Sequence, residues 1–507
     1  MAAHLRQRAV VSSFICTPPE SPSGFTFALF KRSQQVSTYP GKWAVCSGSI
    51  EPTDASPEDA AKREILEETT LSDADIVLLR KGKPFSLVDE ALKTEWTIHP
   101  FAWQLKDGAN PIKFDWEHTD YQFVKPEELA SMDHVPQLEV GLSRILVSPE
   151  TEKDLAVLRN DHKCGAKALA LKALELLSKA VQSKELASLS TSKEFWAELK
   201  WRAWHLAKNG RPSMGAAIEA GLFRTLDNIR HMFLTSPGGI DSVPLPLLKS
   251  STESAIETTI EAKKQSLSDL VGHFTKFVEM SARHEKGAAT KIVTLSSSGT
   301  ITESLARMIE RLALLNLSVK ISVLESRPKF EGVTFVNTLL ESLDSQTGAN
   351  THVEVEIVSD ASVASVVADA DYLVFGGDKV IPNGDVSNKI GSLTAALVAK
   401  NLNPKCSVAA LFETDKIAGS GFDAGHLKVE YNDEAEVMDA WPTSAVVALE
   451  KNQKQGYKVK VKNAYFEWVP AKYIDYYISE QGLLSRQDIE QLGTESEELE
   501  KRVFEDL

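Results

Sequence analysis

The 507-residue chain has few of the features that would place it in a specialised class of protein. It has only four cysteines, Cys16, Cys46, Cys164 and Cys406. They are widely scattered and form no C-x-x-C pair, so the sequence predicts neither a zinc site nor a disulfide framework and fits a reducing compartment. No apolar run approaches the length of a membrane span. Residues 1–10 carry charges without the apolar core of a secretion signal, so we expect a cytoplasmic protein.

The chain also has fewer positively charged residues than negatively charged ones. The chain has 56 lysines and arginines against 71 aspartates and glutamates, which gives a formal net charge of −15. This excess of negative charge argues against direct binding to nucleic acid or to an anionic membrane. The hydrophobic share of 43% and the charged share of 25% are those of an ordinary soluble globular protein. The length predicts about three domain-sized units.

The most informative segment carries three carboxylates at helical spacing. Glu64, Glu67 and Glu68 stand at positions i, i+3 and i+4, which share one face of an α-helix. Three negative charges on one face repel one another unless a cation neutralises them. Because hard oxygen ligands suit Mg²⁺ or Mn²⁺, the pattern predicts a site for one of these ions. Arg63 is placed to pair with Glu67 one turn later.

The residues around this run predict where the helix starts and what precedes it. Ser56 is the expected N-cap, and Pro57 is the expected first helical residue. Ile65 and Leu66 are expected to supply an apolar side of the helix. Residues 39–51 predict a strand followed by a glycine turn and a loop.

This loop and helix resemble the Nudix box, G-x5-E-x7-R-E-U-x-E-E-x-G-U. Arg63 and the three glutamates fall on its R-E-U-x-E-E core, and Leu71 supplies the final apolar residue. Thr70 stands where the box has its last glycine. Strict spacing places Ser49 at the first glycine and Ala55 at the isolated glutamate.

A one-residue insertion in the loop would restore Gly48 to the first glycine position and leave Asp54 as the nearest acid. The resemblance implies a hydrolase that cleaves a nucleoside diphosphate linked to another moiety. It also implies that Glu64, Glu67 and Glu68 hold the metal while Arg63 orients them. Glu117, in a later loop, is a candidate further ligand, with a plain surface acid as the alternative.

The second half of the chain begins with helical patterns and continues with alternating strands and helices. We expect helices at 168–177, 196–206, 214–232, 251–284 and 303–315, with a loop at 239–250. We expect apolar strands at 292–295, 319–324, 353–358, 372–375 and 408–412. Short apolar strands separated by helices predict a parallel, doubly wound sheet. Ligands of such sheets bind at the carboxyl ends of the strands.

Polar residues follow these strands. Ser296, Ser298, Gly299 and Thr300 come after the first strand, where hydroxyls and backbone N–H groups can cradle a phosphate. Arg327 comes after the second strand and can grip a phosphate with two hydrogen bonds. A third polar segment, 376–391, follows a later strand. Together these positions predict a phosphate-binding site.

Motifs in this half resemble the translation initiation factor 2B alpha/beta/delta family, which includes methylthioribose-1-phosphate and ribose-1,5-bisphosphate isomerases. Residues 376–391 are close to its G-A-D-x4-N-G-D-x2-N-K-I-G, which contains Asp378, Asn388 and Lys389. Residues 325–328 match its E-x-R-P. Four further segments carry the likeness: 161–166, 210–214 with Arg211, 463–470 and 478–482.

The resemblance implies a pocket for a phosphosugar or nucleotide, and an assembly that is a homodimer or larger. The isomerases move a proton with a cysteine and an aspartate. Asp378 falls on the aspartate, whereas Ser296 takes the place of the cysteine. A hydroxyl is a far weaker acid than a thiol, so we expect ligand binding rather than isomerisation. Two alternatives stay open: a non-catalytic regulator like the initiation factor, and an isomerase that uses Ser296 differently.

The sequence therefore predicts an α/β multidomain protein. Residues 7–150 form the Nudix domain, expected as an α/β/α sandwich with a mixed sheet. Residues 155–287 form a helical subdomain, and residues 288–490 form the doubly wound, Rossmann-like domain. Residues 491–507 are expected to be an acidic tail.

Overall fold

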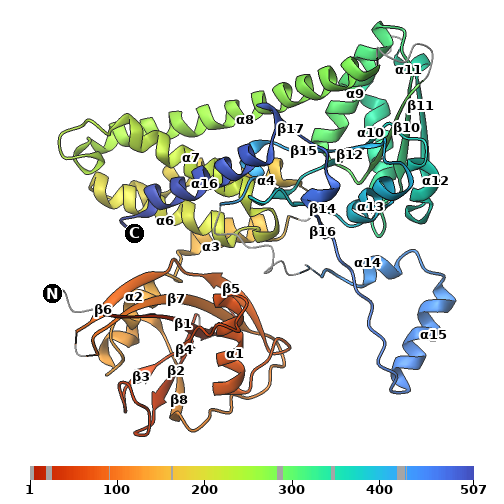
Figure 1. Cartoon of the computed structure of the whole chain (residues 1–507). Helices are drawn as coiled ribbons and strands as arrows, with labels where there is room; N and C mark the ends of the chain where they lie inside the picture. The colour runs from red at the N-terminus through yellow and green to blue at the C-terminus, as the bar shows by residue number, and fades with distance from the viewer. Residues whose placement is uncertain are drawn as a thin grey trace. The chain divides into compact units, whose positions relative to one another are not determined.

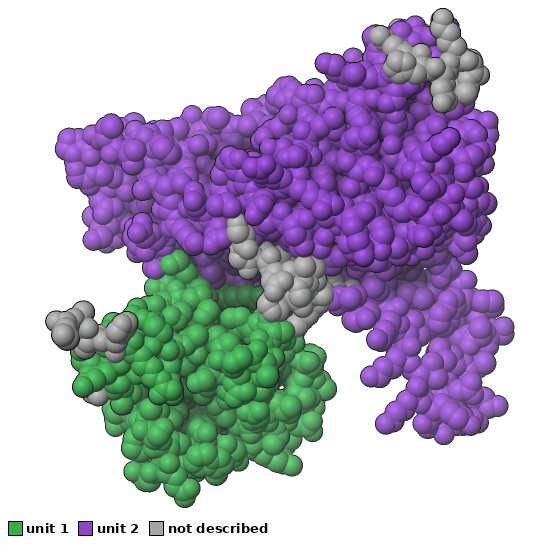
Figure 2. Space-filling view, in the orientation of Figure 1, with its two compact units in different colours: residues 1–153 green, residues 154–507 purple. Residues whose placement is uncertain are grey.

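The computed structural model describes residues 5–18, 25–90, 92–161, 164–282, 289–343, 349–419, 429 and 431–507. The chain forms two compact units, residues 1–153 and residues 154–507 (Figure 2). A further division of the second unit at residue 287 stays a prediction. Of the helices in the described ranges, none combines the length and the apolar character that crossing a bilayer requires.

The first unit is built on one mixed eight-stranded sheet (Figure 1). The strands follow the order β3-β2-β1-β7-β5, with β4 paired to β1, β6 to β7 and β8 to β2. The strands are β1 (Arg6–Cys16), β2 (Phe27–Arg32), β3 (Trp43–Ala44), β4 (Cys46–Ser49), β5 (Ile76–Lys81), β6 (Phe85–Asp89), β7 (Thr94–Leu105) and β8 (His118–Val124). The helices are α1 (Pro57–Thr69), α2 (Leu138–Ser143) and α3 (Pro149–Arg159), which crosses the boundary between the units.

Helices cover both faces of this sheet because the side chains of β1 alternate in direction. Ile15 of β1 packs with Ile65 of α1 in one hydrophobic cluster. Phe14, its neighbour in β1, packs with Leu138 and Leu142 of α2 in another. The parallel pairing of β1 with β7 runs through the middle of the sheet. The predicted α/β/α sandwich with a mixed sheet is confirmed.

The second unit begins with a group of helices. They are α4 (Ala166–Val181), α5 (Lys184–Ala187), α6 (Ser192–Asn209), α7 (Gly215–Met232) and α8 (Leu245–Ala282). The expectation of a loop through residue 250 is wrong, because α8 starts at Leu245. The expectation of a loop came from Pro246, because proline usually interrupts a helical pattern. A proline is tolerated in the first helical turn, where backbone N–H groups have no partner within the helix.

A seven-stranded sheet follows, in the order β11-β10-β9-β12-β15-β17-β18. Its strands are β9 (Thr290–Leu295), β10 (Val319–Leu324), β11 (Val353–Val358), β12 (Tyr372–Gly376), β15 (Ser407–Leu411), β17 (Tyr476–Ser479) and β18 (Gly482–Leu484). All neighbours pair in parallel except β17 and β18. The accompanying helices are α9 (Gly299–Leu314), α10 (Glu331–Ser342), α11 (Ala349–His352), α12 (Val363–Val367) and α13 (Ser392–Leu402).

The two faces of this sheet have separate hydrophobic clusters. Ile301 of α9 and Phe335 of α10 belong to one cluster. Val367 of α12 and Ala396 of α13 belong to the other. Helices therefore pack on both faces, which confirms the predicted doubly wound sheet.

The remaining elements are a second, smaller sheet and helices near the C-terminus. They are the small sheet β13 (Lys379–Val380), β14 (Val386–Lys389) and β16 (Phe466–Val469), and the helices α14 (Ala435–Met438), α15 (Thr443–Lys454) and α16 (Arg486–Phe504). Most of the segment expected as an acidic tail lies in α16. The ring of Phe504 packs against Phe223 of α7, with centroids 4.8 Å apart. Arg502 donates to Asp227 of α7 from both Nε and Nη2.

Candidate functional site

Helix α1 presents the predicted carboxylates. Ser56 is its N-cap and accepts a hydrogen bond from the backbone N–H of Asp59, and Pro57 is its first residue, as predicted. The helix ends at Thr70, which adopts a left-handed conformation with φ of 63°. A β-branched residue is strained there, and glycine is the residue that this conformation favours.

Arg63 ties the loop before α1 to the helix. Its Nε and Nη2 donate to the two carboxylate oxygens of Asp54 over 3.0 and 2.9 Å. Its Nη1 donates to Glu64 over 2.8 Å and to Glu67 over 3.2 Å. The Arg63 hydrogen bonds lower the pKa of Asp54. Asp54, rather than Ala55, therefore supplies the acid that anchors this arginine.

Gly48 is the glycine that makes room for Glu64. A Cβ atom at Gly48 would lie 2.0 Å from the Glu64 carboxylate, so only glycine fits beside this side chain. Gly48 and Asp54 thus stand at the spacing G-x5-acid. The extra residue relative to the Nudix box lies between Asp54 and Arg63.

Glu68 is the most buried of the three glutamates of α1, at 5% exposure. Its Oε1 accepts from the backbone N–H of Ser47, whereas its Oε2 has no hydrogen-bond partner among the described residues. His118 Nε2 lies 3.7 Å from Oε2. Burial raises the pKa of Glu68 well above its ordinary value, and the charges of Glu64 and Glu117 raise it further.

The acids of this site face one another. Burial raises the pKa of Glu64, and the charges of Glu67 and Glu117 add to that rise. Burial, followed by the charge of Asp115, also raises the pKa of Glu117. The charges of Glu67 and Glu117 thus act on Glu64, and those of Glu64 and Glu117 act on Glu68.

The donors in this cluster suit a hard divalent cation. They are carboxylate oxygens, of which those of Glu64 and Glu67 share Arg63 as a partner, and one of them, Glu68 Oε2, is buried without a hydrogen-bond partner in the described part of the chain. No three His, Cys, Asp or Glu side chains in the described ranges are close enough to enclose a metal as they stand. The residue types fit a magnesium or manganese ion, and the side chains must converge further to bind one.

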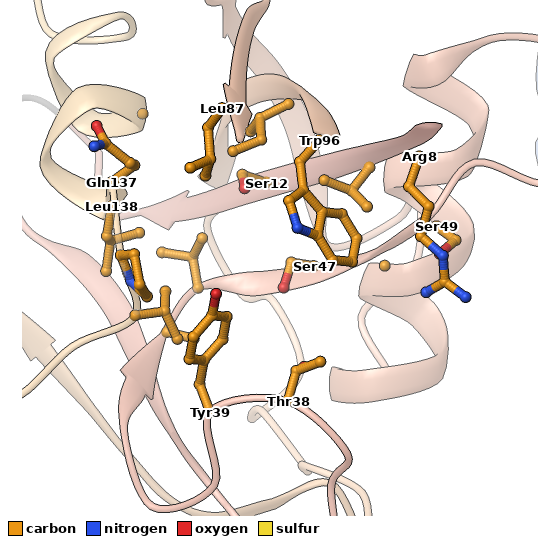
Figure 3. Close-up of a pocket in the computed structure, with 18 of the residues that line it drawn as sticks. Arg8, Ser12, Thr38, Tyr39, Ser47, Ser49, Leu87, Trp96, Gln137 and Leu138 are labelled. Atoms are coloured by element: carbon orange, nitrogen blue, oxygen red, sulfur yellow. The ribbon is translucent and has the colours of Figure 1, made fainter. Parts of the chain in front are cut away.

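A pocket of about 220 Å³ lies beside the Nudix-like loop (Figure 3). Ser47 and Ser49 of β4 line it together with Trp96 of β7 and Tyr39 of the loop before β3. The guanidinium of Arg8 lies 5.7 Å from the centre of the Trp96 ring. The Trp96 indole N–H is buried without a hydrogen-bond partner among the described residues. An aromatic surface with a cation beside it suits a planar, anionic group.

A second group of predicted residues meets at the carboxyl end of β9. Ser296, which has φ of 69°, donates from Oγ to Glu331 over 2.9 Å. Lys389 Nζ donates to the other oxygen of Glu331 over 3.1 Å. Sequence reasoning missed Glu331, the first residue of α10. The sequence feature that could have identified Glu331 is its position three residues after Pro328 of the E-x-R-P motif.

Asp378 and Arg327 belong to the same neighbourhood. Burial raises the pKa of Asp378, the nearby cations Lys416 and Lys389 lower it, and Glu331 raises it. Arg327 and Lys389 line one small cavity. Ser296, Arg327 and Lys389 therefore lie around Glu331 and this cavity, and Asp378 interacts electrostatically with Lys389 and Glu331.

The other predicted ligand-binding residues have local roles in the structure. Ser298 caps α9 by accepting from Ile301, and Gly299 and Thr300 form the first turn of that helix. Asn388 donates to Ser392 over 2.9 Å. Arg211 donates to the backbone carbonyl of Arg159. Residues 162–163 of the 161–166 motif lie outside the described residues.

These sites define a chain of two parts: a Nudix-type α/β/α sandwich with an acidic loop and helix, and a doubly wound unit with a polar cluster at its strand ends. Residues 7–143 match the model of the NUDIX domain. Residues 162–486 match the model of the initiation factor 2 subunit family. The chain belongs to the initiation factor 2 subunit family and carries a NUDIX domain before it.

Curated relatives are sugar-phosphate isomerases by name. The ribose 1,5-bisphosphate isomerase of Archaeoglobus fulgidus is 28% identical over 234 residues, which are 45% of this chain and 66% of the relative. The methylthioribose-1-phosphate isomerase of Aspergillus clavatus is 31% identical over 161 residues, 30% of this chain and 40% of the relative. This chain thus spans less than two thirds of the length of both relatives.

A solved structure of the translation initiation factor eIF-2B from Pyrococcus horikoshii OT3 is also similar. It has 18% sequence identity and a TM-score of 0.46, and the match covers 67% of this chain and 98% of that one.

Proposed function

We propose that the first unit is a metal-dependent hydrolase that cleaves a nucleoside diphosphate linked to another moiety, with Mg²⁺ or Mn²⁺ as cofactor. The observation that carries this proposal is the placement of Glu64, Glu67 and Glu68 on α1, with Arg63 bound to Glu64 and Glu67 and the charge of Glu117 acting on Glu64 and Glu68. NUDIX domains generally use divalent cations. The adjoining pocket, with its aromatic and cationic lining, would receive the part of the substrate next to the diphosphate.

The chain's own residues have distinct tasks in this reaction. Asp54 fixes Arg63, and Arg63 holds Glu64 and Glu67 in place. A bound divalent cation neutralises charge on the diphosphate and lowers the pKa of a coordinated water. One carboxylate of the cluster accepts the proton of the attacking water.

The second unit would bind a phosphosugar or nucleotide at the cluster of Ser296, Arg327, Asp378 and Lys389. The fusion of the two units suggests ADP-ribose as one substrate. Its hydrolysis yields AMP and ribose 5-phosphate, and a phosphosugar-binding unit could hold or sense the second product. The named relatives, which act on ribose phosphates, support this ligand class.

A hydrolysis screen tests the proposal for the first unit. The full chain is incubated with ADP-ribose, NADH, diadenosine polyphosphates and sugar nucleotides, with Mg²⁺ or Mn²⁺. We expect metal-dependent cleavage of at least one of these, and a loss of about 100-fold or more in Glu68→Gln and Glu67→Gln, because each variant removes a charge from the metal site. Glu127→Gln, which alters an exposed carboxylate of the same unit, should match the wild type. No cleavage of any substrate, or full activity in Glu68→Gln, would refute the proposal.

Isomerisation is the second candidate function, favoured by the names of the relatives and by the position of Asp378. Ser296 donates to the Glu331 carboxylate, so any proton transfer on this side of the site would involve that pair. Incubation with ribose 1,5-bisphosphate or methylthioribose 1-phosphate tests it. A ketose product that Asp378→Asn fails to form would establish isomerisation. Absence of both activities would leave the non-catalytic regulator.

A further inference from the structure

The part of the strand-end site between the E-x-R-P motif and Lys389 is narrow. Residues of the E-x-R-P motif, Lys389 and Tyr465 line a cavity of only about 10 Å³. A space of this size holds at most about one water molecule. A phosphosugar therefore cannot enter this place in the conformation that the structure describes.

Two carboxylates of the same chain form ion pairs with lysines that line this cavity. Glu331 accepts from Lys389 over 3.1 Å and from Ser296 over 2.9 Å. Glu436 of α14 lies 3.1 Å from Lys329 Nζ. These two acids come from separate elements, and each is bound to a cation where an anionic ligand would need one.

Helix α14 is further attached to the site by three hydrogen bonds. Arg327 Nη2 donates to the backbone carbonyl of Val437 over 3.0 Å. Glu436 also accepts from the Asn463 side chain over 2.9 Å and from the Tyr465 hydroxyl. Arg327, the residue expected to grip a phosphate, is thus directed to the backbone of α14. A ligand that uses Arg327 must release this helix.

We propose that Glu331 and Glu436 occupy the site in place of the anionic group of the ligand, and that a phosphomonoester binds by displacing them. This inference rests on the proposed phosphate binding by the second unit. Glu331 determines which ligands can bind, because a ligand must displace its carboxylate. A dianionic phosphate offers Lys389 and Ser296 more negative charge and more acceptor oxygens than a carboxylate does, whereas a neutral sugar cannot displace it.

Competition between Glu331 and an anionic ligand for Lys389 predicts the direction in which the ligand affinity changes. Glu331 is part of the chain, so its effective concentration at Lys389 is high and it weakens every anionic ligand that needs this lysine. The substitution Glu331→Gln keeps the shape of the side chain but removes its negative charge, so the variant has no carboxylate that competes with the ligand. The glutamine variant should therefore bind phosphate more tightly, although it has lost a residue of the site.

Calorimetric titration of the full chain with ribose 5-phosphate, and separately with inorganic phosphate, tests this. We expect Glu331→Gln to bind at least about tenfold more tightly than the wild type, and Glu436→Gln to shift in the same direction. Glu341→Gln changes an exposed acid of the same helix and should leave the affinity unchanged. Circular dichroism of each variant verifies its fold.

Hydrogen exchange of the wild type gives a second measurement that needs no variant. Ribose 5-phosphate should accelerate exchange in residues 431–438, because displacing Glu436 and Val437 frees α14. Binding without any change in this segment, or equal or weaker affinity in Glu331→Gln, would overturn the displacement and leave phosphate binding intact. If neither the wild type nor any variant binds either probe, both proposals fail.

Discussion

At the scale of single residues, Asp54 organises the acid cluster of the first unit although it lies outside the helix. It is 6% exposed and accepts two hydrogen bonds from Arg63, which in turn holds Glu64 and Glu67. Hydrogen bonds between charged groups contribute about 1.5–3 kcal/mol, or roughly ten- to a hundredfold in an equilibrium.

We therefore expect Asp54→Asn to lower the rate of metal-dependent hydrolysis by about tenfold or more. The amide keeps the shape of the side chain but cannot hold both nitrogens of Arg63 with a negative charge. Initial rates at saturating metal provide the measurement. Asp73→Asn breaks only a surface pair with Lys62 and serves as the matched control. An unchanged rate in Asp54→Asn would show that Arg63 needs no anchor.

Sequence could predict the residues whose contacts are local, and it failed where the fold brings distant residues together. The helical period places Glu64, Glu67 and Glu68 on one face without any tertiary information. The same local pattern misjudged Leu66, which is 51% exposed, because the sheet covers the side of α1 that carries Ile65. Glu331 escaped notice because its partner Lys389 is 58 residues away in sequence.

At the scale of elements, the C-terminus of α1 carries a strained residue. Thr70 adopts φ of 63°, a conformation that disfavours any residue with a Cβ and a β-branched one most of all. We expect Thr70→Gly to stabilise α1 by about 1 kcal/mol. Hydrogen exchange of peptides from residues 57–69 in the full chain should slow by roughly fivefold.

Thr70→Ala is the informative control for this prediction. Alanine also removes the hydroxyl and the branch, but it retains the Cβ that the left-handed conformation disfavours. A gain of protection in both variants would assign the effect to the threonine side chain. No gain in Thr70→Gly would show that the helix end relaxes around the strain.

Strands rich in valine and isoleucine were predictable, and strands made of polar residues were not. The expected bounds 319–324 and 353–358 coincide with β10 and β11, because valine and isoleucine dominate both. Strand β14, by contrast, is Val-Ser-Asn-Lys within a segment rich in glycine and asparagine. It pairs both with the neighbouring two-residue strand β13 and with β16, which lies far along the chain, and its own residues form no apolar run that would mark it as a strand.

At the scale of the whole molecule, each unit has its own hydrophobic clusters. One cluster of the first unit groups Val11, Phe30, Ile65 and Trp103, and another groups Phe14, Leu29 and Leu142. All of these residues precede residue 153. Two clusters of the second unit group residues from 270 onward, and helices α4, α6 and α7 bury further apolar residues of that unit. Stability of one unit should therefore not depend on the other.

We expect a fragment of residues 1–153 to fold by itself and to retain the hydrolase activity of the full chain within about twofold. Circular dichroism, cooperative thermal unfolding and the substrate screen provide the measurements. A fragment that is unfolded would contradict the independence of its core. A fragment that is folded and inactive, beside an active full chain, would show instead that residues after 153 contribute to the hydrolase site.

The contact between α7 and α16 sets an order of events during protein synthesis. Asp227 and Arg502, which join these helices, are 275 residues apart in sequence. A ribosome must therefore finish nearly the entire chain before α7 can acquire its partner. The first unit, whose hydrophobic clusters use only residues before 153, can fold while the rest of the chain is still being synthesised, since domains generally fold as units from the N-terminus. Until α16 emerges, the apolar surface around Phe223 stays uncovered, and nascent chains at that stage are the ones most in need of chaperones.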